Sequence, residues 1–453
     1  MARKTVDMTS GPLLSKIIVF IIPLLIMNFM QRLYSMADML VVGRFAGSDS
    51  LAAVGATTAF TNLLINILVN VAVGVSTVVA QAIGAKDKDC VNRSVHTAMA
   101  ISMWGSVVIA VVGIVTCRPI LALMGTPETI LDKSTLYMRI LLAGYPINSI
   151  YNFGAAILRA KGDTKSPLAY LTIAGITNVV LNVVFVVGFK MTVEGVALAT
   201  VLSQLVSAIL VSRSLLHEDY PYLVNIKQIR FHGNELKRIL MIGAPIAFQS
   251  MMFSLSNMVL QSAVNSFGET AVAGAAACSN VDAILYVIVV APAHAATIFT
   301  GQNIGAKKYD RVLKVMMYCM GVVLAVGIPA CAVFYIFGKQ FLGLYTDKMA
   351  VIENGMKIMK ILAPSYFICG LMDVISSCLK GMNKAFYSMG SAITGLIGVR
   401  LMWVFTYFAA HRDLTVLYMS YPLSWSFVIV VDLIMFTIFF KKLKAEQAIE
   451  PAI

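Results

Sequence analysis

The sequence predicts an all-α protein that crosses a membrane with twelve helices, arranged as two bundles of six. Three observations lead to this prediction. The 453 residues are 59% hydrophobic and only 13% charged, with a mean hydropathy of +0.84. Apolar runs recur along the whole chain, each about as long as the ~20 residues that a helix needs to cross a bilayer. Several motifs of the first half also return, in order, in the second half.

The apolar runs are bounded by charged residues, glycine or proline. The first run follows basic residues, but it is too long for a signal peptide and has no small-residue cleavage site. We therefore expect it to be retained as a helix. The predicted spans are 13–42, 51–82, 91–117, 134–158, 166–189, 193–212, 239–266, 271–304, 312–337, 355–379, 385–410 and 414–440.

Lysine and arginine are concentrated in alternate connections. With a cytoplasmic N-terminus, the inside segments hold 23 of the 35 basic residues, including Arg3 and Lys4, and the outside segments hold nine. The positive-inside rule then places both termini in the cytoplasm. We expect the protein to lie in a bacterial or archaeal plasma membrane (inner membrane). The same rule accounts for the net charge of +13, so we expect no nucleic-acid partner.

The longest polar stretch is 213–238, halfway along the chain. It predicts a cytoplasmic linker between an N-terminal bundle, 1–212, and a C-terminal bundle with a short tail, 239–453.

Internal repeats support this division. "AQAIGAKDKD" at 80–89 and "GQNIGAKKYD" at 301–310 are identical at six of ten positions. "ADMLVVG" at 37–43 aligns with "SNMVLQS" at 256–262, and "LRAKGDTK" at 158–165 aligns with "CLKGMNK" at 378–384. Because each half has an even number of helices, the halves share one orientation and should be related by a pseudo-twofold axis along the membrane normal. That geometry suits alternating access.

Motifs for other chemistry are absent from the sequence. There is no Walker P-loop, no H-E-x-x-H, no Cys/His cluster and no dinucleotide fingerprint after a strand. The seven cysteines are scattered and form no C-x-x-C pair. We expect a secondary transporter driven by an ion gradient, with no cofactor and no enzymatic activity.

The motifs "ADMLVVGRFAGSDSLAAVGAT", "AQAIGAKD", "YNFGAAILRAKGDTKSP", "TNVVLNVVFVVG" and "VEGVALATVLSQ" together resemble the multidrug and toxic compound extrusion (MATE) family. The resemblance covers about residues 10–440. It implies two six-helix bundles around an outward V-shaped cleft, and export of organic cations or amphipathic drugs in exchange for H⁺ or Na⁺. The alternative is a lipid-linked oligosaccharide flippase of the same superfamily, which would need additional helices and a cationic cavity for phosphates.

Asp38 is the main candidate for the coupling residue, because it lies within the first apolar span. A charged aspartate at the centre of a helix costs about 2.5–3.5 kcal/mol, so such residues usually face the protein interior and function there. A buried carboxylate could bind a proton from one side of the membrane and release it to the other. The alternative is a structural ion pair with Arg32 or Arg44.

Other polar side chains are expected around Asp38. Tyr34 lies one turn before it, and Asn178 and Asn182 are four residues apart, on one helix face. The resemblance to the family adds Tyr137 and Thr200 to this site. Because Asn178 and Asn182 are neutral, Asp38 is the single carboxylate of this site. Binding of Na⁺ by Asp38, Asn178 and Asn182 is therefore less certain than binding of H⁺. Hydrogen bonding between helices is the alternative role for the asparagines.

The second half differs, since Asn257 aligns with Asp38. Asp373 lies in helix 10 and Arg400 is the only basic residue of helix 11. We expect a structural ion pair between them rather than a coupling site.

Helix 8 contributes two further polar candidates, Asp282 and His294. A lone histidine in an apolar helix is usually a satisfied core residue, with proton gating as the alternative. Asp432 and Arg139 lie near span ends and should contact the membrane interface.

Pro23 and Pro245, early in helices 1 and 7, each remove a backbone hydrogen bond and should permit a bend. The 27 methionines, 23 phenylalanines and 17 tyrosines would suit a pocket for varied small molecules, but they are also ordinary packing residues. The expected partners are cationic or amphipathic small molecules and the lipid bilayer. We expect the protein to be a monomer.

Overall fold

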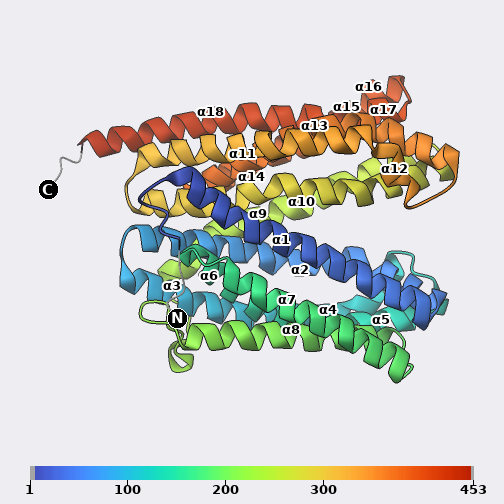
Figure 1. The fold of residues 1–453 in the computed structure, drawn as a ribbon, viewed down its shortest axis with the longest axis horizontal. Coiled ribbons are helices and arrows are strands. Elements are labelled where there is room, and N and C mark those ends of the chain that lie inside the picture. The colour runs from blue at the N-terminus through green and yellow to red at the C-terminus, as the bar shows by residue number, and fades with distance from the viewer. Residues whose placement is uncertain (1–5, 450–453) are drawn as a thin grey trace. The chain divides into compact units, whose positions relative to one another are not determined.

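The computed structural model describes residues 6–449, and all of the secondary structure in this range is helical (Figure 1). Within it, eleven helical stretches are long and apolar enough to cross a membrane. The predicted all-α, polytopic fold is therefore confirmed. Arg3 and Lys4, used above to orient the chain, lie outside the described residues, as do the last four residues of the tail.

One of the twelve predicted spans, 134–158, is divided between two helices. α5 (Glu128–Ala143) has 16 residues and α6 (Tyr145–Lys161) has 17, so each alone is shorter than a full membrane span. Pro146 stands in the first turn of α6, where its missing N–H breaks the helical hydrogen-bond pattern. A side chain at Gly144 would also meet Val201, with Cβ only 2.4 Å from Cγ2. Residue 144 must stay small for α5 and α6 to approach α8.

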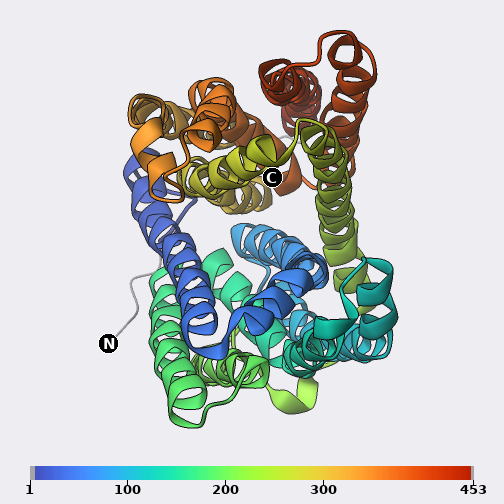
Figure 2. The ribbon, with the colours of Figure 1, turned by 90° about the vertical axis from the view of Figure 1, so that its right-hand side faces the viewer.

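The chain folds into two compact units. The first unit contains Val6 and Ile22–Ala247. Its helices run roughly along one direction, as Figure 2 shows when they are viewed from their ends. Besides most of α1 (Leu13–Val41), it contains α2 (Ser48–Gly84), α3 (Lys88–Ala100), α4 (Ser106–Leu123), α5, α6, α7 (Lys165–Asn182) and α8 (Val193–Leu216), with the π-helical segments η1 (Val42–Ala46), η2 (Ile101–Gly105) and η3 (Val183–Gly188) and the 3₁₀ turn η4 (Ile226–Gln228).

Among the described residues, the second unit contains Asp7–Ile21 and 248–449. A large apolar core joins its helices and includes Phe334, Leu362 and Trp425. Besides most of α9 (Gly233–Asn265), its elements are α10 (Glu269–Gly305), α11 (Tyr309–Ile336), α12 (Gly338–Gly343), α13 (Met349–Gly381), α14 (Ala385–Ala392), the π-helical η5 (Ile393–Val399), α15 (Arg400–Phe405), α16 (Tyr407–Ala410), α17 (Leu414–Tyr418) and α18 (Ser420–Ile449).

Two helices, α1 and α9, change unit along their length. α1 begins in the second unit and passes into the first between Ile21 and Ile22, one residue before Pro23. α9 begins in the first unit and passes into the second after Ala247, two residues beyond Pro245. Both predicted bend positions therefore lie where a helix leaves one unit for the other.

Each unit also holds the polar segment that precedes the helix it shares. In the second unit, Asn303 Nδ2 donates to Met8 O at 3.2 Å and Arg311 Nη2 donates to Ser10 O at 3.1 Å. The Met8 side chain is fully buried there. The N-terminal segment is thus anchored beside the second copy of the repeated loop, 301–310.

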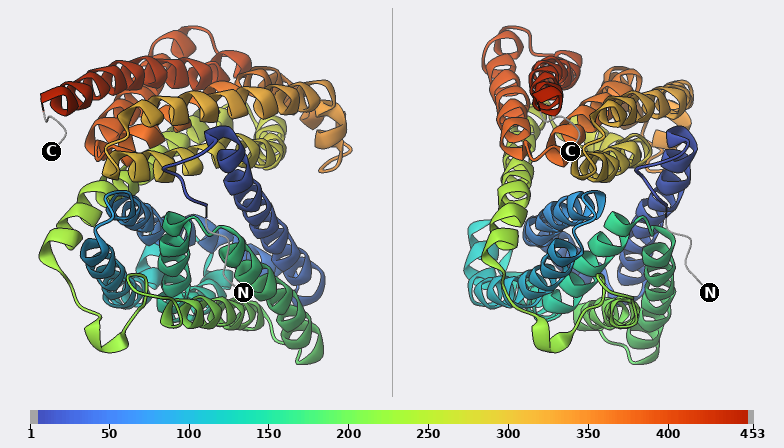
Figure 3. Two further views of the ribbon diagram at one scale, coloured as in Figure 1. Left: turned by 60° about the vertical axis from the view of Figure 1, so that its left-hand side comes forward. Right: turned by 90° about the vertical axis from the view of Figure 1, so that its left-hand side faces the viewer.

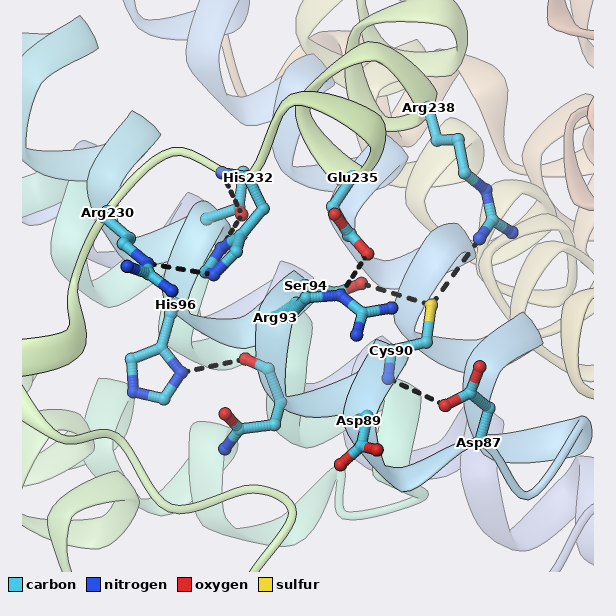
Figure 4. Close-up of polar contacts among 12 residues, drawn as sticks. Asp87, Asp89, Cys90, Arg93, Ser94, His96, Arg230, His232, Glu235 and Arg238 are labelled. Atoms are coloured by element: carbon cyan, nitrogen blue, oxygen red, sulfur yellow. Dashed lines mark hydrogen bonds and ion pairs between the residues drawn. The ribbon is translucent and has the colours of Figure 1, made fainter.

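The first unit holds the linker between α8 and α9 in a similar way (Figure 3). Arg93 Nε and Glu235 Oε1 form an ion pair at 2.7 Å, and Arg238 Nη2 donates to Gln81 Oε1 at 3.1 Å. His96 and His232 add further contacts around α3 (Figure 4). The linker is therefore anchored next to the first copy of the repeated loop, 80–89.

Candidate functional site

Asp38 lies near the end of α1, half-buried inside the first unit. Its Oδ1 accepts a hydrogen bond from Asn182 Nδ2 of α7 at 2.5 Å. Arg32 and Arg44 are exposed, and within the described part of the chain Asp38 forms no ion pair with either. The negative charge of Asp38 is thus supported by an amide alone.

A short polar relay extends from Asp38 into α7 and α8. Asn182 Nδ2 is also 3.3 Å from Asn178 Oδ1, and Asn178 Nδ2 donates to Thr200 Oγ1 at 3.5 Å. Asn178 and Asn182 are both buried, as expected for one shared helix face. The structure therefore brings four of the predicted residues together.

The relay has more acceptors than donors. Asn182 Oδ1 is buried and has no hydrogen-bond partner among the described residues. An unpaired buried carbonyl is costly, so it needs a donor or a cation close by. A proton on Asp38 or a bound Na⁺ would satisfy that oxygen, since amide and carboxylate oxygens suit both. The donor set thus fits a small cation, with only one formal negative charge.

The two predicted tyrosines behave differently from each other. Tyr34 OH donates to the backbone oxygen of Thr172 at 3.4 Å, and its ring lies over Gly175, where a Cβ would come within 1.8 Å of Cζ. Tyr34 therefore packs α1 against α7 and does not bond Asp38. Tyr137 is half-buried and lies within the electrostatic influence of Asp38, without a hydrogen bond to it.

The family model MatE matches the chain twice, at residues 23–184 and 245–406. The chain belongs to the MatE family. The two matches begin 222 residues apart and cover well over half of the sequence. The family comprises transporters rather than enzymes, so the expected absence of catalysis agrees with membership.

Similar MatE proteins align over most of their own length. The chain is 26% identical over 416 residues to "Probable multidrug resistance protein YoeA" of Bacillus subtilis, covering 90% of each chain. It is 24% identical to a "FAD transporter" of Shewanella oneidensis, over 79% of each. A solved outward-facing multidrug resistance MATE family transporter of the MOP superfamily superimposes with a TM-score of 0.90 at 22% identity, over 98% of this chain and 100% of that one. The structural likeness shows the fold alone.

In the second unit, the structure does not form the expected ion pair between Asp373 and Arg400. Arg400 Nε donates to Ser424 Oγ at 3.0 Å, and Nη1 donates to Asn257 Oδ1 at 3.5 Å. Asp373 accepts from Tyr286 and interacts electrostatically with Lys380. The expectation was wrong because each charge finds partners on other helices, which spacing within helices 10 and 11 cannot reveal.

The two polar residues predicted in helix 8 both lie on α10. Asp282 is half-buried in α10 and accepts hydrogen bonds from Tyr366 and, weakly, from Cys278 Sγ at 3.9 Å. His294 lies on an exposed position of α10, so it is not a core residue of this unit.

Asp432 corrects another expectation. It was placed at the membrane interface, but its side chain is fully buried in α18. The Ser376 and Ser391 hydroxyls both donate to its carboxylate. Sequence reasoning missed this contact because the serines belong to two other helices; the only available signal was an acid inside a long apolar run. Arg139, by contrast, is exposed.

Proposed function

We propose that this protein is a secondary antiporter that exports organic cations and other amphipathic compounds in exchange for H⁺, with Asp38 as the coupling residue. The observation that carries the proposal is a half-buried carboxylate bonded to Asn182, beside an amide oxygen without a partner. The relative named as a multidrug resistance protein, matched along nearly its whole length, supports this substrate class.

The mechanism follows from competition for one negative charge. With Asp38 ionised, Asn182 donates to it and the site attracts a cation. Protonation removes the charge and gives Asp38 a hydroxyl donor. Asn182 Oδ1, which has no partner among the described residues, could accept a hydrogen bond from that hydroxyl after the amide rotates. Proton binding and cation binding therefore exclude each other, which is what exchange requires.

H⁺ is a better candidate than Na⁺ for the coupling ion. The site offers a single carboxylate, with neutral ligands at Asn178, Asn182 and Thr200. A bare Na⁺ usually needs more oxygen ligands and more negative charge than one acid provides, whereas a proton needs only the acid and one acceptor. Na⁺ exchange remains the alternative that an experiment must separate.

We further propose that both termini face the cytoplasm and that the two homologous halves operate by alternating access. The bias of basic residues toward one set of connections supports the orientation. Bending of α1 at Pro23 would couple the state of Asp38 to this movement. Unchanged coupling in Pro23→Ala would count against helix bending.

Reconstituted vesicles test the coupling. Ethidium movement is followed under an imposed pH gradient and, separately, under a Na⁺ gradient. The wild type should respond to the pH gradient, and Asp38→Asn should fall to the level of protein-free vesicles. Asp347→Asn, at an exposed position, is the matched control and should transport normally. Equal transport by Asp38→Asn and the wild type would show that Asp38 is not the coupling residue.

A further inference from the structure

Arg400 is a fully buried guanidinium in the second unit. It is 0% exposed and is the largest fully buried side chain among the described residues. Its Nε and Nη1 reach Ser424 and Asn257, both neutral. Its Nη2 is buried and has no hydrogen-bond acceptor among the described residues. Part of the donor capacity of this side chain is therefore unused.

The charge of Arg400 also lacks a counter-ion. Arginine stays protonated in proteins, and a buried charge without an opposite charge costs several kcal/mol. Two acids of the same unit have other partners: Asp282 accepts hydrogen bonds from Tyr366 and Cys278, and Asp373 accepts one from Tyr286, although its buried Oδ2 has no hydrogen-bond partner among the described residues. Over residues 6–449, no carboxylate forms an ion pair with Arg400.

Aromatic rings surround the guanidinium instead. It lies 4.1 Å from the ring centre of Tyr421 and 5.5 Å from that of Phe253. Tyr421 also stacks on Tyr418 and meets Trp425 edge-on, with ring centres 5.6 and 5.7 Å apart. Cation–π contacts offset part of the burial cost. The rings also provide flat apolar surfaces next to a positive charge.

Arg400 lies only one layer below the surface of its unit. Phe253, whose ring covers it, is 36% exposed, and its hydrogen-bond partner Asn257 is half-buried. The guanidinium therefore lies next to side chains that reach the surface of the unit.

We propose that Arg400 binds the anionic group of an aromatic organic anion or zwitterion, with Tyr421 and Phe253 contacting its ring. A carboxylate, sulfonate or phosphate would supply the missing acceptor and the missing counter-charge together, and a planar guanidinium binds such groups with two parallel hydrogen bonds. The inference rests on the proposed transport of amphipathic compounds, but not on the identity of the coupling ion.

Binding of two matched flavins tests the proposal. Flavin mononucleotide and riboflavin share one ring system, and only the former carries a phosphate. Affinities are measured on the purified protein in detergent, without any gradient. The wild type should prefer flavin mononucleotide by about tenfold or more, since hydrogen bonds to charged groups contribute about 1.5–3 kcal/mol. Arg400→Gln should equalise the two affinities, and Arg400→Lys should keep part of the preference.

Two control variants separate this proposal from the antiport proposal. Arg412→Gln removes an exposed positive charge from the same unit and should keep the preference. Asp38→Asn should also keep it, even though transport is lost. Equal affinities in the wild type, no measurable binding of flavin mononucleotide, or a preference that survives Arg400→Gln would each overturn the assignment.

Thermal stability without ligand provides a second test. A ligand-binding Arg400 costs stability in the empty protein, so Arg400→Met should melt at the same temperature as the wild type or higher. A structural Arg400, holding α9 to α18, would instead make Arg400→Met melt clearly lower, and that result would overturn the proposal.

Discussion

The two halves of the chain make the same contact with opposite charges. In the first unit, Asp38 of α1 accepts from the amide of Asn182. In the second, the aligned residue is Asn257 of α9, and it accepts from the guanidinium of Arg400. The offset of 219 residues that relates Asp38 to Asn257 places Arg400 opposite Leu181, directly beside Asn182. The duplicated scaffold has kept a polar contact between equivalent helices while its net charge has changed sign.

A π-helical segment flanks each contact, but on opposite sides of the polar residue in the two units. The π-helical segment η3 begins directly after Asn182, and η5 ends directly before Arg400. Such segments interrupt the regular backbone pattern and occur often at functional sites. Both halves therefore place a polar side chain next to a π-helical segment, with an acid in the first unit and a guanidinium in the second.

The largest expected effect comes from making the second unit resemble the first. Asn257→Asp would place a carboxylate beside Arg400 and complete a buried ion pair. We expect the melting temperature to rise, with a gain of about 2 kcal/mol, the scale of a charge-assisted hydrogen bond. The preference for flavin mononucleotide over riboflavin should disappear, because the counter-charge is now internal.

Asn265→Asp, which adds an acid at the far end of α9, is the control for a change in net charge. A fall in stability in Asn257→Asp, with the flavin preference intact, would contradict the idea that Arg400 lacks a partner.

The next largest effect concerns the ion preference of the Asp38 site in the first unit. Asn182→Asp gives the site a second carboxylate next to Asp38 and supplies charge that favours a bare cation. We expect Na⁺, compared with K⁺ at equal ionic strength, to raise the melting temperature of this variant but not of the wild type. A wild type that is already stabilised by Na⁺ would argue for Na⁺ rather than H⁺ coupling.

Helix contact provides a third comparison. In the second unit α9 meets η5 through Ser256, whose hydroxyl donates to Leu396 O at 2.7 Å. In the first, α1 meets α7 through the Tyr34 ring over Gly175. Gly175→Ala should therefore destabilise the protein by about 1–3 kcal/mol through overpacking, measured by thermal unfolding.

Adding Tyr34→Ala should rescue Gly175→Ala, because the ring that clashes is removed. Gly390→Ala in α14, where a Cβ meets nothing within 4 Å, is the neutral control. A Gly175→Ala protein as stable as the wild type would show that the contact of Tyr34 with Gly175 is adaptable.

The smallest effect concerns the linker, outside the membrane. Burial, aided by the Arg230 guanidinium, lowers the pKa of His232 below its ordinary 6.5 (Figure 4). The folded protein therefore favours the neutral ring, and stability should decline as pH falls below about 6.5. His232→Gln should flatten this part of the stability curve slightly, in melting measurements at stepped pH. An unchanged slope would mean that other groups cause it.

Sequence alone predicted the fold and most of the first site. Hydropathy identified the spans, and the i, i+4 spacing put Asn178 and Asn182 on the face that meets Asp38. Sequence analysis failed to predict the partners of polar side chains where those partners belong to other helices. The partners of Arg400, Asp373 and Asp432 all come from other helices, and periodicity within one helix does not say which neighbour its polar face meets.

The anchoring of the N-terminus has a consequence for biosynthesis. Met8 and Thr9 are held by Asn303 and Lys308, which the ribosome adds about 300 residues later. The residues that bind Met8 and Thr9 are therefore synthesised long after this segment. The start of α9, by contrast, contacts residues of the first unit that have already been synthesised. This N-terminal segment therefore cannot dock until α10 and the loop after it have been translated.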